Sequence, residues 1–193
     1  QNGINVAEID HVRESDNPRF RVISNRGMSD IYMIEKIIHA RDSQLADLSI
    51  TFTYPFADPQ YQEMVCELMS QQDENIGRSE KKSDLFALLK ESLLVISIPK
   101  SDSSPRSVYE AIFCGCCVAA RPNPWIDALP ASMKSRIYIV DLNNPEWLKL
   151  AYEFSIETSQ IPFEPCEDAL NRYDEASSLR LVLDRFYSDA AKL

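Results

Sequence analysis

The sequence predicts an α/β domain built on a doubly wound parallel sheet of about six strands, with helices on both faces. Strand-like and helix-like segments alternate along the chain, which is the pattern of a parallel sheet covered by crossover helices. The predicted strands are continuously apolar, as in Leu93–Ile98, and this is typical of strands buried on both faces. A length of 193 residues fits a single domain with its own core.

Caps and turn residues divide the first half of the chain. Ser29 and Asp58 are each suited to capping a helix, and Pro59 follows Asp58 at the first helical position. The first half is predicted to contain these elements: a strand at 20–24, a helix from Ser29 to about Asp42, a strand over Leu48–Pro55, a helix from Asp58-Pro59 and a short strand around Asn75–Ile76.

The second half continues the alternation. It is predicted to contain these elements: a helix from Ser83, a strand over Leu93–Ile98, a loop and helix after Ser101, a strand over Cys116–Ala120, a loop over Arg121–Pro130 with one helical turn, a strand over Arg136–Val140, a helix opened by Asn144-Pro145 and a last helix after a Pro-containing linker.

Three of these helices carry apolar residues with helical spacing, so each is expected to turn one stripe toward the core. The stripes are Tyr61, Met64, Val65, Leu68 and Met69 in the helix from Asp58; Leu148, Ala151, Tyr152 and Ser155 in the helix from Asn144; and Leu179, Val182, Leu183, Phe186 and Tyr187 in the last helix.

The net charge of −10 argues against a general nucleic-acid binder, which needs a basic surface. A local cationic pocket for one small anion remains compatible with it. No apolar run approaches the roughly 18 residues of a membrane span, and the polar first ten residues predict no signal peptide. Because the chain begins with Gln1 rather than Met, targeting information outside it stays open.

The cysteine and histidine pattern predicts no metal site. Three of the five cysteines lie in or beside the predicted core, and we interpret all of them as buried reduced thiols of a cytosolic protein. The cysteines are Cys66, Cys114, Cys116, Cys117 and Cys166. No second Cys/His pair with zinc spacing accompanies 114–117, and His11 and His39 stand alone.

The stretch "SDSSPRSVYEAIFCGCC" (Ser101–Cys117) follows a strand end, which is where open α/β sheets bind ligands. Ser104 is expected to cap the helix and Pro105 to begin it, leaving the amides of residues 106–108 pointing out of the helix start. Free amides and the helix dipole together favour a phosphate group. This stretch therefore predicts an anion site.

Glu110 lies one turn further along the same helix. A carboxylate there would accept hydrogen bonds from a vicinal diol such as a ribose, so the helix start and Glu110 together suggest a nucleotide. A simpler interpretation is also open, because Ser-x-Pro is a common helix cap and an exposed Glu on a helix is ordinary.

The same stretch resembles the signature of the GT-B glycosyltransferases, particularly the large retaining family 4. C-terminal domains of that family carry a pattern like S-[DE]-G-x-P-x-S-x-x-E-A-[MI]-x-C-G-x-P-V-[IV]-A. Asp102 and Glu110 match its acidic-x7-acidic spacing. The other matching positions are Pro105, Ser107, Ala111 and Gly115.

The resemblance covers nearly the whole chain. "NGINVAEI" (2–9) resembles the segment between the family's two domains, and "FRVISNRG" (20–27) resembles its first C-terminal strand and "GR" turn. Helix and strand segments at 59–72, 82–105 and 141–154 also follow the family's pattern. The resemblance implies a Rossmann-like C-terminal half of a GT-B enzyme, without the N-terminal acceptor domain.

The resemblance also implies roles for individual residues. Asp102 and Glu110 would be the catalytic-centre residues, Asp102 near the transferred sugar and Glu110 on the ribose hydroxyls. The implied donor-binding set is Arg26 on the diphosphate, the amides of Arg106 and Ser107 with the Ser107 hydroxyl on the distal phosphate, Ser104 at the helix cap, Asp102 and Glu110. The nucleobase would lie near Gly77, Arg78 and Ser79.

The sequence departs from the family pattern around these residues. The family has a lysine about five residues after the arginine, where this chain has Ile31 or Tyr32. Asn25 replaces the glycine before the arginine, Asp102 is shorter than the usual Glu, and the next glycine is Ser103. Arg106 is a candidate for the missing positive charge, whereas Lys36 is expected on an exposed helix face.

The leading hypothesis is a glycosyltransferase domain that binds a nucleotide-diphosphate sugar, with a UDP-sugar favoured, and transfers a hexosyl group to a glycan or lipid-linked acceptor in polysaccharide biosynthesis. Retention of configuration is implied by the resemblance alone. The expected cofactor set is empty, with the nucleotide sugar as substrate and no metal. The alternative is a non-catalytic nucleotide-sugar-binding module, a degenerate transferase; a flavodoxin-like or receiver domain is disfavoured because "VISNRG" lacks an acidic cluster.

The resemblance divides the chain into an interdomain segment (1–19), a nucleotide-sugar-binding core (20–160) and a C-terminal helical extension (161–193). The expected partners are the nucleotide-sugar donor and the protein's own N-terminal acceptor-binding domain, and no nucleic acid. The expected location is cytoplasmic, with peripheral contact at the inner face of the membrane left open for the full-length protein. The isolated domain is expected to bind nucleotide without turnover.

Overall fold

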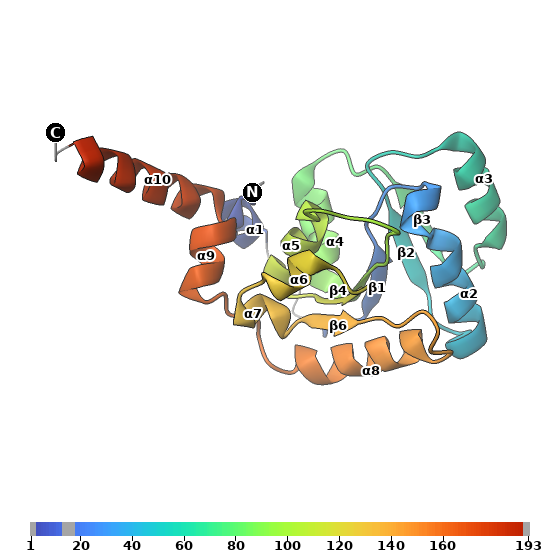
Figure 1. The fold of residues 1–193 in the computed structure, drawn as a ribbon. Helices are drawn as coiled ribbons and strands as arrows, with labels where there is room; N and C mark the ends of the chain where they lie inside the picture. The colour runs from blue at the N-terminus through green and yellow to red at the C-terminus, as the bar shows by residue number, and fades with distance from the viewer. Residues whose placement is uncertain (1–2, 13–17, 191–193) are drawn as a thin grey trace.

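The computed structural model describes residues 3–12 and 18–190, and in this part six parallel strands form one sheet in the order β3-β2-β1-β4-β5-β6 (Figure 1). The strands are β1 (Arg21–Ser24), β2 (Ile50–Thr53), β3 (Glu74–Gly77), β4 (Ser92–Ser97), β5 (Cys117–Ala120) and β6 (Ile137–Ile139). The register pairs Val22 with Ile50 on one side and with Leu94 on the other. The predicted doubly wound parallel sheet is confirmed.

Helices connect successive strands and extend beyond the last one. They are α1 (Val6–His11), α2 (Ile34–Gln44), α3 (Pro59–Leu68), α4 (Lys82–Glu91), α5 (Arg106–Phe113), α6 (Pro124–Asp127), α7 (Ala131–Lys134), α8 (Trp147–Ser159), α9 (Glu167–Tyr173) and α10 (Glu175–Ala190).

Two apolar layers cover the two faces of the sheet. Successive strand residues point to opposite faces, so Val22, Leu94 and Ile96 pack with α2 and α8, whereas Ile23 and Val95 pack with α1, α4 and α5. All of these strand side chains are almost fully buried. Burial on both faces explains why the strands read as continuous apolar runs.

The strand order reverses between β1 and β4, which are neighbours in the sheet but distant in sequence. A crevice forms at the carboxyl ends of such strands because their following loops diverge to opposite faces. The loop after β1 holds Asn25 and Arg26, and the loop after β4 leads through Asp102 into α5. The fold therefore brings the predicted site residues to one edge of the sheet.

The helix predicted from Ser29 begins later than expected. A short 3-10 turn spans Asp30–Tyr32, and α2 starts only after Met33, whose φ of 51° is left-handed. The backbone of this loop is tied to its neighbours, since the Lys100 amide donates to the Ile31 carbonyl at 2.8 Å. That contact holds the turn near β4 and delays the helix. The helix predicted from Asn144-Pro145 likewise begins at Trp147.

The predicted last helix is two helices, α9 and α10. The N-terminal segment interrupts it: the Ile4 amide donates to the Tyr173 carbonyl at 2.8 Å, and the Glu175 amide donates to the Ile4 carbonyl at 2.8 Å. Asp174 then accepts from the amide and hydroxyl of Ser177. A backbone bridge from the start of the chain therefore breaks a periodic pattern that the sequence alone could not divide.

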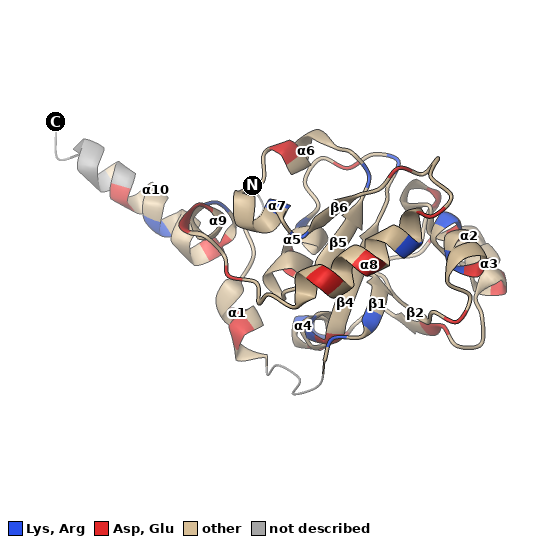
Figure 2. Ribbon diagram, turned by 90° about the horizontal axis from the view of Figure 1, so that it is seen from below, with Lys and Arg blue, Asp and Glu red and all other residues tan. Residues whose placement is uncertain are grey.

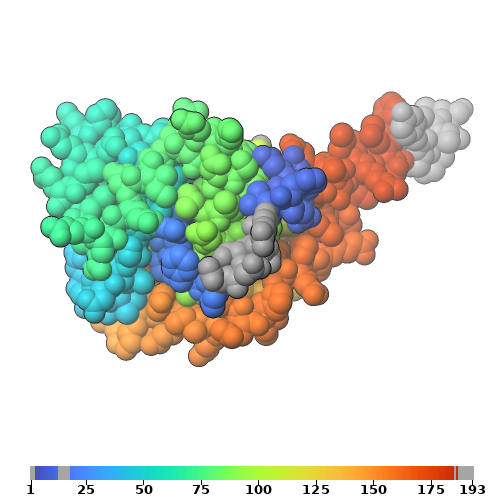
Figure 3. Space-filling model, turned by 180° about the vertical axis from the view of Figure 1, so that it is seen from behind, coloured from blue at the N-terminus to red at the C-terminus, as the bar shows by residue number. Residues whose placement is uncertain are grey.

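The three predicted stripes differ in burial. In α8, Leu148, Ala151 and Ser155 are buried as expected, and Tyr152 is half-buried. In α3 only Val65 is buried. In α10 the stripe is exposed, with Leu179 at 60% and Val182 at 64%; the side chain of Tyr187 lies outside the described residues. Figures 1 and 3 show α10 projecting away from the body of the molecule.

Lysine and arginine residues are interspersed with Asp and Glu over the described elements and form no continuous basic face in the view of Figure 2. In the described ranges, no helix combines the length and apolarity needed to cross a bilayer.

The division into segments 1–19, 20–160 and 161–193 stays a prediction, and residues 1–2, 13–17 and 191–193 lie outside the described part. Ile4 and Ile9 are buried in the core layer that contains α4 and α5.

Candidate functional site

Arg26 meets two predicted residues of a distant stretch, Asp102 and Ser107, where the strand order reverses. Arg26 Nη2 lies 2.5 Å from Asp102 Oδ2, and Arg26 Nη1 donates to Ser107 Oγ at 2.7 Å. The guanidinium also lies over the Tyr32 ring, 4.7 Å from its centroid. Arg26 is therefore a buried cation already paired with a carboxylate, and a phosphate there would share or compete for that charge.

The start of α5 differs from the predicted cap. The N-cap residue is Pro105, with no side-chain cap hydrogen bond, so the Ser104 side chain does not cap the helix. The Arg106 amide donates to the Ser104 carbonyl at 3.0 Å, and the Val108 amide donates to the Pro105 carbonyl at 2.9 Å. The prediction of Ser104 as the cap is wrong, and of the three amides expected to be free, two have backbone partners.

The loop before α5 is held by its neighbours, which explains why Ser104 does not cap the helix. Asn123 Nδ2 donates to the Asp102 carbonyl at 2.9 Å, while Arg26 holds the Asp102 side chain. Burial chiefly, with the nearby Tyr173 hydroxyl, raises the pKa of Tyr109 to about 12, although the neighbouring Ser104 side chain opposes the shift. The Tyr109 hydroxyl therefore stays protonated near neutral pH.

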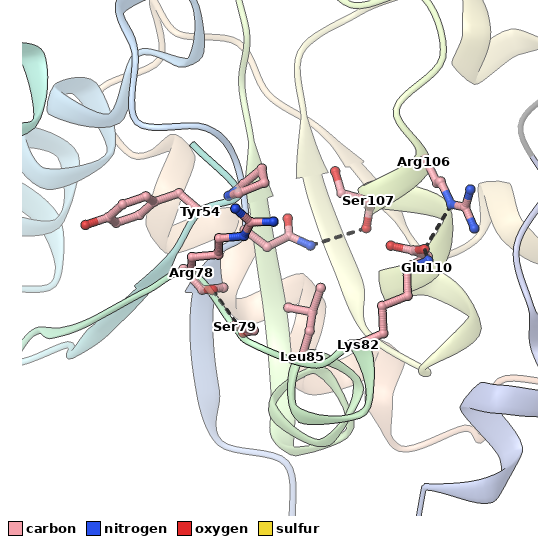
Figure 4. Close-up of a pocket in the computed structure, with 11 residues that line it drawn as sticks. Tyr54, Arg78, Ser79, Lys82, Leu85, Arg106, Ser107 and Glu110 are labelled. Carbon is pink, nitrogen blue, oxygen red and sulfur yellow. Dashed lines mark hydrogen bonds and ion pairs between the residues drawn. The ribbon is translucent and has the colours of Figure 1, made fainter. Parts of the chain in front are cut away.

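A pocket of about 390 Å³ opens beside this ion pair, between the starts of α4 and α5 and the loops after β2 and β3 (Figure 4). Its lining residues are Asn25, Thr53, Tyr54, Pro55, Arg78, Ser79, Lys82, Leu85, Arg106, Ser107 and Glu110. Arg106, Ser107 and Glu110 lie on one side, and Arg78 and Ser79 on the other. Arg26, Asp102, Ser104 and Gly77 are not among the lining residues.

Glu110 is the one acidic side chain of the lining, and it is almost fully buried. Its Oε1 atom accepts from Lys82 Nζ at 3.0 Å and from Arg106 Nε at 3.1 Å. With Arg78, the pocket has three cations against one carboxylate, in a chain whose net charge is −10. The pocket is therefore suited electrostatically to an anion.

Three buried polar atoms at the end of β1 have no hydrogen-bond partner among the described residues: Ser24 Oγ, Asn25 Oδ1 and Arg26 Nε. Asn25 is 6% exposed and donates through Nδ2 to the Ser107 carbonyl at 3.3 Å. Buried polar atoms without a partner are uncommon because desolvation is costly. Of these three residues only Asn25 lines the pocket, and Arg21 and Arg41 carry similar unpartnered atoms elsewhere in the described part of the chain.

The cysteines divide into two groups. Cys114, Cys116 and Cys117 are buried, and burial raises the pKa of each thiol. Cys66 and Cys166 are exposed, so the interpretation of all five as buried is wrong for these two. In the described ranges, no three His, Cys, Asp or Glu side chains group closely enough to hold a metal ion.

Lys82 is a further residue of the pocket that the sequence motifs do not indicate. It is the first residue of α4, 28 positions before Glu110. A lysine at the first helical position is opposed by the helix dipole, and this local mismatch was the available signal. The contact with Glu110 joins two helices and has no counterpart in the local pattern.

The fold has relatives among solved structures. HepE from Anabaena, in complex with UDP and glucose, matches with a TM-score of 0.71 at 15% identity over 97% of this chain and 55% of its own. The C-terminal domain of LpcC, a glycosyl transferase group 1 family protein from Francisella tularensis, matches with a TM-score of 0.60 at 12% identity over 90% of this chain and 100% of its own. AviGT4, a glycosyltransferase involved in avilamycin A biosynthesis, matches with a TM-score of 0.64 at 14% identity over 99% of this chain and 58% of its own.

The N-terminal domain of a trehalose-6-phosphate phosphatase from Candida albicans also shares the fold, with a TM-score of 0.65 at 10% identity over 95% of this chain and 48% of its own. No protein-family model and no curated protein sequence matches the chain significantly. The chain spans about half the length of HepE and AviGT4. At these identities the matches establish architecture: the chain has the fold of the C-terminal half of a GT-B glycosyltransferase.

Proposed function

We propose that this chain is the donor-binding half of a glycosyltransferase and that its pocket binds a nucleoside-diphosphate sugar, with a UDP-sugar favoured. The observation that carries the proposal is the cationic pocket at the carboxyl edge of a sheet whose fold is shared with HepE, a protein solved with UDP and glucose. In such folds ligands bind in the crevice where the strand order reverses. The pocket, the start of α5, Asn25 and Arg26 all lie there.

The proposed placement follows the chemistry of the lining. The ribose diol binds the Glu110 carboxylate, and the diphosphate lies near Arg106, the Ser107 amide and hydroxyl, and Arg26. The nucleobase lies toward Arg78 and Ser79, which the pocket contains; Gly77, at φ 71°, shapes the turn before them. Asp102 faces the transferred sugar only if it leaves or shares its pairing with Arg26.

The same groups would assist transfer of the sugar. As the glycosidic bond breaks, negative charge grows on the departing nucleoside diphosphate, and cations and a helix start already in place stabilise that charge. We therefore assign the isolated chain a binding role, with turnover depending on an acceptor-binding half. The apolar stripe of α10 offers a surface for that half, since large exposed apolar patches commonly mark interfaces.

Titration calorimetry of the chain against UDP, GDP, ADP and their sugars tests the binding proposal. We expect one nucleoside diphosphate to bind, with affinity reduced at least about tenfold by Arg26→Lys, which loses the guanidinium's fork of donors, and by Glu110→Gln, which loses the carboxylate charge. Arg172→Gln is the matched control, because Arg172 pairs with Asp168 on α9 away from the pocket. Circular dichroism of each variant establishes that it is folded. Absence of binding by every nucleoside diphosphate would refute the proposal.

A second candidate is a nucleotide-sugar-binding module without catalysis. It is favoured by the absent lysine after Arg26, by the Arg26–Asp102 pairing, and by the occurrence of the fold in a protein named for phosphatase activity. Both candidates predict nucleotide binding. The full-length protein distinguishes them: if it releases nucleoside diphosphate from a nucleotide sugar in the presence of glycan or lipid-linked acceptors, it is a transferase. We propose a polysaccharide pathway and a cytoplasmic or peripheral membrane location only for the transferase candidate.

A further inference from the structure

Two cations of the pocket lie at the first residues of helices, where the helix dipole opposes a positive charge. Lys82 begins α4 and Arg106 begins α5. The partial positive charge of a helix start destabilises a nearby cation, so neither position favours folding by itself. Both side chains nevertheless point at the same buried carboxylate, that of Glu110. Such a local conflict between charge and helix is expected at functional sites.

The geometry leaves part of Glu110 available. The contacts from Lys82 Nζ and Arg106 Nε both fall on Oε1. Figure 4 shows the other carboxylate oxygen pointing into the pocket, toward the side where Ser107 lies. A carboxylate can accept about four hydrogen bonds over its two oxygens. Glu110 can therefore keep both cations and still receive a ligand hydroxyl.

Lys82 also has donors to spare. An ammonium has three N–H groups on a flexible four-carbon stem, and Glu110 takes one of them. The Lys82 side chain is 46% exposed and lines the pocket, so its remaining donors can reach a ligand. Arg26, by contrast, is already paired with Asp102. Lys82 and Arg106 share one carboxylate, so their side of the pocket carries one uncompensated positive charge, and Arg78 carries another on the opposite side.

We propose that Lys82 is a phosphate-binding residue whose ammonium bridges Glu110 and the diphosphate of the bound nucleotide. It would supply the charge of the lysine that this chain lacks after Arg26, but from the start of α4. The inference rests on the proposed function. In this proposal Lys82 contacts the phosphates, whereas Glu110 contacts the ribose. The loss of affinity on replacing Lys82 should therefore grow with the number of phosphates in the ligand, whereas the loss on replacing Glu110 should not.

The test uses the best binder among UDP, GDP and ADP, together with its monophosphate, its nucleoside and inorganic pyrophosphate. Affinities for the wild type and for Lys82→Gln are measured by calorimetry, with competition for the weak ligands. We expect Lys82→Gln to weaken the diphosphate about tenfold at low salt, the monophosphate less, and the nucleoside not at all. The difference should shrink as ionic strength rises, and Lys82→Arg should recover most of it.

Lys149→Gln provides the matched control. The Lys149 side chain is also 46% exposed and also pairs with a glutamate, Glu146, but it lies on α8 and does not line the pocket. We expect it to leave every affinity unchanged. Urea unfolding of both variants shows whether an affinity change reflects a folding defect.

Two results would overturn the role of Lys82: an equal loss of affinity for the diphosphate and the nucleoside, which would mean that Lys82 only orients Glu110, or no loss at all. Pyrophosphate separates this failure from failure of the proposed function. If pyrophosphate binds in a Lys82-dependent way but no nucleoside diphosphate binds, the nucleotide proposal fails and the phosphate role stands. If neither binds, both fail.

Discussion

Basic side chains lie at both edges of the sheet, but they meet opposite ends of the helices. At the amino edge, Arg19 donates to the carbonyls of Leu89 and Cys114, near the ends of α4 and α5, at 3.2 and 2.6 Å. Arg136 donates to the Thr158 carbonyl near the end of α8 at 3.3 Å. Cations at these ends satisfy carbonyls that the helices leave free and are favoured by the helix dipole.

At the carboxyl edge the arrangement is reversed. Lys82 and Arg106 begin their helices, and only Glu110 compensates them. Buried polar atoms without partners do not separate the two edges, since Asn25 and Arg26 carry them at the carboxyl edge and Arg21 and Arg41 at the amino edge. The comparison teaches that the cations of the amino edge lie where helix dipoles favour them, whereas Lys82 and Arg106 at the carboxyl edge lie where helix dipoles oppose them. The proposed anionic ligand would account for the second arrangement.

The largest expected loss of stability follows from replacing Arg41, which lies in the last turn of α2 at the amino edge. The Arg41 and Asp73 side chains are 1% and 0% exposed, and Arg41 Nη1 lies 2.6 Å from Asp73 Oδ1. Arg41→Met leaves Asp73 buried without its cation, so we expect it to lower the free energy of unfolding by about 3–5 kcal/mol. Urea unfolding followed by circular dichroism measures the loss.

Arg106→Met is the counterpart at the carboxyl edge. Arg106 is 37% exposed and stands at a helix start, so we expect its replacement to change the free energy of unfolding by less than about 1 kcal/mol. Equal costs at Arg41 and Arg106 would contradict this contrast between the two edges.

A second experiment sharpens the role of Glu110. If the carboxylate binds a ribose diol, the wild type should prefer a ribonucleoside diphosphate over its 2′,3′-dideoxy analogue by about 1.5–3 kcal/mol, which is the usual range for hydrogen bonds to a charged group. Glu110→Gln should lose most of that preference, because the amide is a weaker acceptor. Affinities of both ligands for both proteins give the answer, and an unchanged preference in Glu110→Gln would place the ribose elsewhere.

The sheet could be predicted from the sequence because residues close together in the chain determine each strand–helix unit. The apolar strands and the stripe of α8 come from short-range patterns that burial then satisfies, as at Leu148 and Ala151. The stripe of α10 has the same periodicity but lies exposed at Leu179 and Val182. A periodic stripe indicates that a face favours burial, but it does not say what covers the face.

The candidate site was predictable in part for the same reason. Asp102 and Glu110 belong to one continuous stretch, and the structure places both beside the reversal of strand order. The pairing of Arg26 with Asp102 joins residues 76 positions apart, and that of Lys82 with Glu110 joins residues 28 apart. Such pairings depend on how helices pack, so neither they nor the loss of the Ser104 cap could be derived from local propensity.

The smallest expected effect concerns Lys81, the N-cap residue of α4. Its backbone is extended, with φ −120° and ψ 148°, and no side chain caps the helix. Serine in this conformation can accept from the amides of the first turn, so Lys81→Ser should raise the free energy of unfolding by about 1 kcal/mol. Lys81→Ala, which removes the charge without adding a cap, is the control, and urea unfolding measures both.

Because Lys81 does not line the pocket, nucleotide affinity should stay the same. A stabilised protein with unchanged affinity would show that stability can be gained at the carboxyl edge without changing a residue that lines the pocket. If serine proves no better than alanine, the start of α4 is not short of a cap, and the contrast between the edges rests on Lys82 and Arg106 alone.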